Sequence, residues 1–189
     1  MNRFNVATFL FAGLTVSSCF GQVAEFSISG GQSLISDKTI ASGVTLDDGF
    51  NLTFRLTLNS WAYFGHEFGY GYNRSTLTYP GGSGGMAIHQ GFYDFLVYAL
   101  PEGKRFRPFV TGGGHFSNFV PPGQSATQGG GSNKFGFNYG GGLKLRVSDR
   151  WQVRGDFRQY FTGKPFGNYF PVSGSFKQNV ISVGLGFVL

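Results

Sequence analysis

Cysteine and charged residues are scarce in this chain of 189 residues. Cys19 is the single cysteine, and only 13% of the residues are charged. A lone cysteine excludes a disulfide within the chain. Lysines and arginines are scattered singly, with no run longer than Lys104-Arg105. The net charge of +6 therefore does not point to nucleic acid as a partner.

Long apolar runs and helical periodicity are also missing. Beyond the N-terminal segment there is no run of about 20 apolar residues, which excludes a transmembrane helix. Glycine and aromatic residues are abundant instead, with 32 Gly, 23 Phe and 18% aromatic residues. These residue types suit sheets and close backbone approach. The composition predicts an all-β fold, and the length suits one domain.

The N-terminus has the pattern of an export signal. Asn2-Arg3 supplies a small positive region, and Val6 to Val16 form an apolar segment too short to span a bilayer. We predict cleavage after Gly21, which leaves a signal peptide of residues 1–21 and one domain of residues 22–189. Cys19 then departs with the signal. In the alternative interpretation the four residues ending at Cys19 act as a lipobox, and Cys19 is lipidated.

Strand-like alternation recurs along the rest of the chain. Alternating apolar and polar residues indicate strands with two different faces. Several of these segments reach the length of about 10 residues that a tilted strand needs to cross a bilayer. The predicted strands are 24–29, 50–59, 63–72, 89–100, 107–116, 134–147, 151–161 and 179–189.

The links between these segments alternate in length. Short links are expected at 59–62, 100–107 and 148–150, and long ones at 31–49, 73–85, 118–133 and 162–176. Hairpins with this pattern point short turns one way and long loops the other. The Gly- and Ser-rich stretches at 81–85 and 123–133 are typical of solvated loops.

The two faces of each strand show which side is inward. In 151–161 the charged residues Arg154, Asp156 and Arg158 alternate with Val153, Gly155 and Phe157. A water-soluble barrel, such as an exported lipocalin-like binding protein, would expose the small polar face and needs more surface charge than this chain has. With bulky residues facing lipid and polar groups inside, the pattern predicts a closed, antiparallel, up-and-down transmembrane barrel of about eight strands.

Charges inside such a barrel require partners, because buried charges persist only when paired. Acids available to the two arginines of 151–161 include Asp156 itself and residues of other strands, with Glu25 as a further candidate. We predict a network that fills the interior, made of Arg55, Glu67, Asp94, Lys144, Arg146, Arg154, Asp156 and Arg158.

The chain resembles the small outer-membrane β-barrel family, of the OmpA-like membrane-domain type. The resemblance is carried by RPFVTGGGHF (107–116), by the GFNYGGGLKLRV to WQVRGDFRQYF hairpin, and by the alternating C-terminal strand that ends at Leu189. Family members commonly end in an aromatic residue, whereas here Phe187 precedes the terminal leucine by two positions. The resemblance implies a location in the outer membrane, periplasmic turns and long external loops. It also implies contact with outer-membrane lipid and lipopolysaccharide, insertion by the barrel-assembly machinery, and a monomer.

The resemblance implies no reaction, and we predict a structural or surface-interaction role without cofactor. The segment from His115 to Asn118 resembles a motif of outer-membrane lipid A deacylases, in which Ser117 would be the nucleophile and His115 its base. A nucleophilic serine also needs an orienting acid. No Asp or Glu lies between Glu102 and Asp149, so the enzyme remains the alternative. The three histidines are isolated from other metal-binding residue types, which predicts no metal site.

Overall fold

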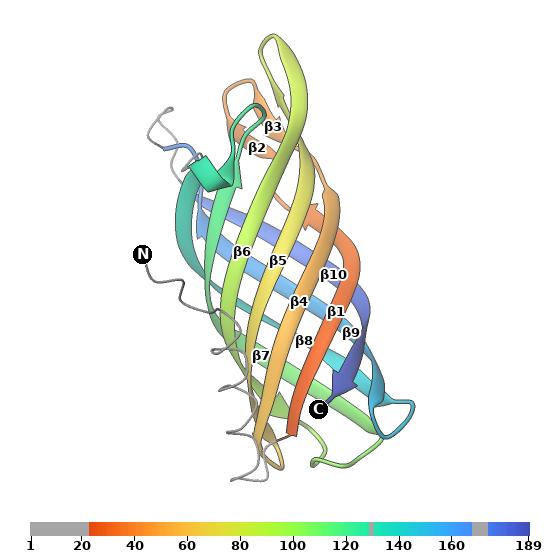
Figure 1. The fold of residues 1–189 in the computed structure, drawn as a ribbon. Coiled ribbons are helices and arrows are strands. Elements are labelled where there is room, and N and C mark those ends of the chain that lie inside the picture. The colour runs from red at the N-terminus through yellow and green to blue at the C-terminus, as the bar shows by residue number, and fades with distance from the viewer. Residues whose placement is uncertain (1–22, 129–130, 168–173) are drawn as a thin grey trace, which may run out of the picture.

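The computed structural model describes residues 23–128, 131–167 and 174–189 (Figure 1). The predicted signal peptide, residues 1–21, lies outside the described residues. No helix in the described parts of the chain is long and apolar enough to cross a membrane.

Eight long antiparallel strands form the wall of a barrel (Figure 1). They are β1 (Val23–Ile35), β4 (Gly49–Trp61), β5 (Phe64–Tyr79), β6 (Gly82–Tyr98), β7 (Phe106–Val120), β8 (Ser132–Arg146), β9 (Trp151–Gly163) and β10 (Ser175–Val188). Each pairs with its neighbours in the chain, and β1 pairs with β10 from Glu25↔Val188 to Ile35↔Gln178. This last pairing closes the sheet, so the predicted all-β up-and-down barrel is confirmed.

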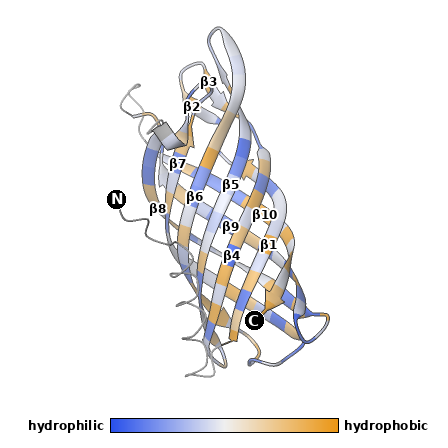
Figure 2. Ribbon diagram, in the orientation of Figure 1, coloured by the Kyte–Doolittle hydropathy of each residue, from blue (hydrophilic) through white to orange (hydrophobic). Residues whose placement is uncertain are grey.

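Side chains alternate between the inside and the outside of the wall along every long strand. On β10, Gln178 and Ser182 are buried while Val183 is 63% exposed. Figure 2 shows the same alternation as changes of hydropathy along the strands. The outside is the apolar face at most positions, and the buried set contains most of the charged residues of the strands.

The connections differ at the two ends of the barrel. Short links, 62–63, 99–105 and 147–150, lie at the end where β1 starts and β10 finishes (Figure 1). The links at the opposite end are 36–48, 80–81, 121–131 and 164–174. The first of these contains a small hairpin of β2 (Thr39–Ala41) and β3 (Val44–Leu46), whose β3 pairs with β5. The third contains a short 3₁₀ turn, Ala126–Gln128.

One predicted loop is wrong. The segment 73–85 forms the continuation of β5 and β6, with pairs running to Tyr79↔Gly82, and only Pro80 and Gly81 remain as a turn. Gly81 has a φ of 103°, which a glycine adopts without strain. The glycines that follow keep their backbone hydrogen-bonding groups in the ladder. A glycine-rich composition therefore did not distinguish a strand end from a solvated loop.

The interior is layered rather than polar throughout. Near the short links, Leu96, Tyr98 and Phe109 form a small buried apolar cluster. The opposite end is closed by a larger apolar cluster, which we call the apolar cap. Its buried members are Ile35, Ile40, Val44, Leu46, Leu77, Met86, Ile88, Phe119, Phe166 and Phe176.

Candidate functional site

A cluster of charged side chains lies between these two apolar clusters. Its members are Arg55 on β4, Glu67 on β5, Asp94 on β6, and Arg154, Asp156 and Arg158 on β9, each 5% exposed or less. We call these six residues the central charge cluster. They come from four strands, and the inward faces of those strands place them at one level of the barrel.

Glu67 is the centre of the cluster. Its Oε2 lies 2.5 Å from Arg154 Nη1, and its Oε1 lies 3.6 Å from Arg55 Nε and also pairs with Arg158. Arg154 extends its guanidinium to Asp156 at 2.7 and 2.8 Å, a two-point arrangement that fixes both groups. Arg158 pairs with Asp94 as well.

The central charge cluster is balanced and further hydrogen-bonded. Three guanidinium groups face three carboxylates, so its formal charge is zero. Neutral partners complete the network: the Thr57 hydroxyl donates to Glu67 at 2.8 Å, and Asn138 donates to Asp94 at 2.8 Å. Such additional bonds offset the large desolvation cost of buried ions. Each of the six charges has an ion-pair partner, while the Nε atoms of Arg55 and Arg158 have no hydrogen-bond partner among the described residues.

Lys144 belongs to a second, separate group. Its ammonium pairs with Glu25 and lies 2.9 Å from the Tyr98 hydroxyl. The same carboxylate accepts from Gln152 at 2.7 Å and from Asn59 at 2.8 Å. Lys144 was predicted within one network with the β9 arginines, and the structure instead gives it its own acid.

Arg146 lies apart from both groups, at the end of the barrel with the short links. It is partly exposed, and its Nη2 lies 3.3 Å from Glu102 Oε1. The other oxygen of Glu102 pairs with Arg107, a residue that the sequence analysis did not select. Arg107 lies two residues before Phe109, which is also inward, in the segment RPFVTGGGHF. This spacing was the signal in the sequence that could have identified Arg107 as an inward residue.

Aromatic rings line the charged layer. The guanidinium carbon of Arg154 lies 4.8 Å from the ring centroid of Phe109, that of Arg158 lies 5.0 Å from Phe92, and that of Arg107 lies 3.7 Å from Tyr98. These are cation–π distances. The Phe92 ring occupies space above Gly69, where a Cβ atom would lie 2.0 Å from the ring. Glycines on inward positions thus make room for large inward side chains.

A chain of amides crosses the interior on the other side of the central charge cluster, toward the apolar cap. Asn51 donates to Asn73 at 2.9 Å, Asn73 to Gln90 at 2.8 Å, Gln90 to Gln178 at 3.0 Å, and Gln178 to Ser33 at 2.6 Å. In the sequence, only the position of Asn51 between the apolar residues Phe50 and Leu52 indicates an inward side chain in this chain of amides. Ion pairs, amides and the apolar cap together occupy successive levels of the barrel.

Known proteins share the fold of this closed eight-stranded wall. The family model described as "Outer membrane protein beta-barrel domain" matches residues 7–188. The chain belongs to this outer-membrane β-barrel family. No curated protein sequence matches the chain.

Solved structures of outer-membrane barrels share the fold. Neisserial surface protein A (NspA) is 10% identical with a TM-score of 0.59, covering 88% of this chain and 96% of that chain. The N-terminal β-barrel domain of Pseudomonas aeruginosa OprF is 12% identical with a TM-score of 0.53, covering 88% and 97%. Ail of Yersinia pestis, in complex with the heparin analogue sucrose octasulfate, is 12% identical with a TM-score of 0.53, covering 89% and 99%. At these identities the likeness extends to the fold.

His115 and Ser117, the alternative catalytic pair, both point into the interior of this outer-membrane barrel. Each is 4% exposed or less. Ser117 Oγ accepts a hydrogen bond from Gln90 Nε2 at 3.2 Å, and neither ring nitrogen of His115 has a partner among the described residues. The structure thus does not pair this serine with a base. Within the described residues, no group of three or more His, Cys, Asp or Glu is arranged to hold a metal ion.

Proposed function

We propose that the protein is a non-catalytic outer-membrane barrel with a closed interior and a structural or surface-interaction role. The observation that carries this proposal is the balanced central charge cluster, six buried side chains that span the interior between β4, β5, β6 and β9. Eight-stranded barrels have an interior only wide enough for side chains. A neutral filling in which each charge has an ion-pair partner offers no free charge to an ion.

The residues on the outward face support the proposed placement in the membrane. Exposed aromatic residues, including Trp61, Tyr63, Phe64, Phe106 and Trp151, gather near the short links. Aromatic girdles of this kind mark membrane interfaces in outer-membrane barrels. We place the short links in the periplasm and the longer links outside, after export with residues 1–21 and insertion by the barrel-assembly machinery.

The register supports the same placement. Shifting β9 by one residue would turn Arg154, Asp156 and Arg158 toward lipid, at up to about 2–4 kcal/mol for each arginine near the bilayer midplane. In the observed register, the residues of β9 that face lipid include Phe157, which is 46% exposed. These apolar side chains carry no such cost. This supports outer-membrane lipid and lipopolysaccharide as the proposed surroundings of the barrel, which we propose acts as a monomer.

The position of the longer links supports an interaction role. All the longer links and the β2–β3 hairpin gather at one end. Among barrels of the same fold, Ail was solved with a heparin analogue. The second candidate, a lipid A deacylase using Ser117, is disfavoured because Ser117 is fully buried and is hydrogen-bonded to Gln90.

Bilayer conductance tests the closed interior. Purified protein inserted into planar bilayers is expected to give at most small, rare openings, with a 16-stranded porin as the positive control. Large, stable channels from the folded barrel would contradict the proposal. Expression in a Gram-negative host with mass analysis of lipid A tests the enzyme alternative, and we expect no loss of acyl chains.

A further inference from the structure

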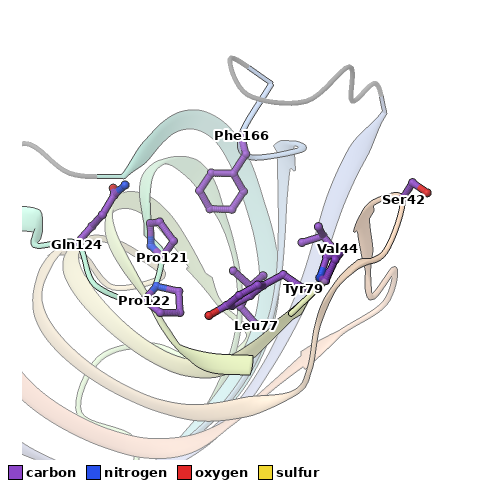
Figure 3. A pocket seen from close by; sticks show the side chains of 9 residues that line it. Ser42, Val44, Leu77, Tyr79, Pro121, Pro122, Gln124 and Phe166 are labelled. Carbon is purple, nitrogen blue, oxygen red and sulfur yellow. The ribbon is translucent and has the colours of Figure 1, made fainter. Parts of the chain in front are cut away.

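An apolar groove opens at the end of the barrel that carries the longer links. Its volume is about 570 Å³. It is lined by Val44 of β3, Leu77 and Tyr79 of β5, Pro121 and Pro122 of link 121–131, and Phe166 of link 164–174. Figure 3 shows these side chains around one space, with the two prolines opposite Val44. Every link at this end of the barrel contributes to the lining, including Pro80 of the β5–β6 turn.

The floor of the groove is the apolar cap. Val44, Leu77 and Phe166 line the groove and are also buried members of the cap. The groove is therefore continuous with a packed apolar layer and does not lead into the charged interior. A ligand placed there would contact apolar atoms below it and solvent above it.

The walls are held in place by backbone features. Three prolines, Pro80, Pro121 and Pro122, fix their own φ angles. Phe166 has a φ of 66°, in the left-handed region that a bulky residue rarely adopts. Its backbone N–H donates to Ser132 Oγ at 3.1 Å, which holds this conformation. Strain maintained by surrounding structure is typical of binding and active sites.

The chemistry of the lining selects the ligand. None of the lining residues that the structure describes is charged, and Ser42 and Gln124 among them are polar and exposed. The lysines of the neighbouring link ends are already paired, Lys38 with Asp48 at 3.1 Å and Lys164 with Asp37 at 2.9 Å. A phosphate or sulfated sugar would find no free cation among the described residues of this lining. A peptide would bring backbone N–H and C=O groups that need partners the lining does not supply.

We propose that this groove binds the acyl chain of a single-chain amphiphile, such as a fatty acid, with its head group in solvent. The volume lies within the range of about 300–1,000 Å³ that is usual for small-molecule sites. The inference rests on the proposed placement of this end outside the cell. It adds a ligand class to the interaction role.

Fluorescent fatty acid binding tests the proposal. The folded barrel, in nanodiscs of saturated phospholipid, is titrated with cis-parinaric acid against empty nanodiscs of the same lipid. We expect saturable binding at one site per barrel, above the partitioning seen with empty discs. Ser42→Trp adds a bulky side chain at the edge of the groove and should weaken binding about tenfold or more. Thr39 is also an exposed hydroxyl residue of this hairpin but does not line the groove, so Thr39→Trp should leave binding unchanged.

A second variant does not depend on how a tryptophan packs. Tyr79→Glu places a charge in the groove that an alkyl chain would have to desolvate, so it should also weaken saturable binding about tenfold or more. Retained heat-modifiable migration in detergent gels shows that each variant is folded. Binding no greater than to empty discs, or equal affinity in Ser42→Trp and Thr39→Trp, would overturn the proposal. The proposal would also be overturned if a proline-rich peptide displaced the probe at a lower concentration than unlabelled fatty acid does. Conductance is measured separately, so a failure here leaves the closed-interior proposal standing.

Discussion

Asp156 shows how the stability of the interior depends on single carboxylates. Both of its oxygens bond to Arg154, and Oδ1 also lies 3.7 Å from Arg158 Nη2. Its neighbour Phe157 points outward and is 46% exposed. The two residues differ by one position in the chain and face opposite environments.

We expect Asp156→Ala to lower the free energy of unfolding by about 3–5 kcal/mol, because it leaves buried positive charge uncompensated. Phe157→Ala should cost less, because acyl chains fill the gap outside the wall. Urea unfolding in lipid vesicles ranks the two variants. Greater damage from Phe157→Ala would contradict the inward assignment of the charged face.

The residue identities of the central charge cluster followed from alternation, but the grouping did not. Alternation placed Arg154, Asp156 and Arg158 on one face, and pairing required acids such as Glu67 and Asp94. The separation of Lys144 with Glu25 depends on how far each strand is shifted against the next. Lys144 is directly opposite Arg154 in the β8–β9 register, yet the two side chains take different acids. The sequence alone therefore does not predict which acid each of these two basic residues pairs with.

At the scale of elements, the β1–β10 seam is the pairing that closes the barrel. Gly184 of β10 lies inside this seam, and a Cβ atom there would come within 2.0 Å of the carbonyl oxygen of Ile28. Gly155, on the neighbouring strand β9, faces outward, and a Cβ atom there would have no neighbour within 4 Å. Gly184 therefore has no room for a side chain, whereas Gly155 has room for one, and the two positions form a matched pair for mutation.

Gly184→Ala should destabilise the barrel by about 1–3 kcal/mol, since the seam must separate to admit the methyl group. Gly155→Ala should be neutral or stabilise by up to about 1 kcal/mol, because it restricts the unfolded chain. Heat-modifiable gel migration across a temperature series compares them. Equal melting of both variants would show that the seam is not as closely packed as described.

The link 36–48 is tied to the barrel by Asp48. Its carboxylate accepts a hydrogen bond from the Ile35 backbone N–H at 2.7 Å, and this bond lowers the pKa of Asp48 below its usual 3.8. A lowered pKa means that the bond stabilises the link above pH 3.8 and is lost as the pH falls through the lower value. Hydrogen exchange at the Ile35 amide, corrected for intrinsic rates, should therefore accelerate below this pH. Asp48→Ala should show the faster exchange already at neutral pH, and unchanged protection in that variant would contradict the assignment.

Element boundaries were less predictable than element number. All eight wall strands were expected, but each extends further toward the outer end of the barrel than its predicted range. The turn between β5 and β6 was missed because its glycine-rich composition resembles a long loop. GGSGG at 81–85 reads as a loop by composition, whereas inward Leu77, Met86 and Ile88 continue the buried face on both sides of the turn. The pairing partner across the hairpin, rather than the local sequence, decides where such strands end.

At the scale of the whole molecule, the barrel is a series of levels with different chemistry. Paired ions and amides occupy the middle, and the apolar cap separates them from the groove. Composition, the low charge content and two-residue alternation were sufficient to predict the barrel and its inside-out polarity. The cap was not predicted, because its members come from the wall strands, the β2–β3 hairpin and the link 164–174, and only the closed fold brings them together.

The orientation of β9 is the claim on which the others depend. Nitroxide labels on single cysteines, in a chain with Cys19→Ser and reconstituted in lipid, report exposure to oxygen dissolved in the bilayer. Label sites are the outward positions Val153, Gly155 and Phe157 and the inward positions Gln152, Tyr160 and Thr162. Power-saturation measurements should give high oxygen accessibility at the three outward sites and low accessibility at the three inward sites. High accessibility at the inward sites, or no alternation at all, would contradict the account.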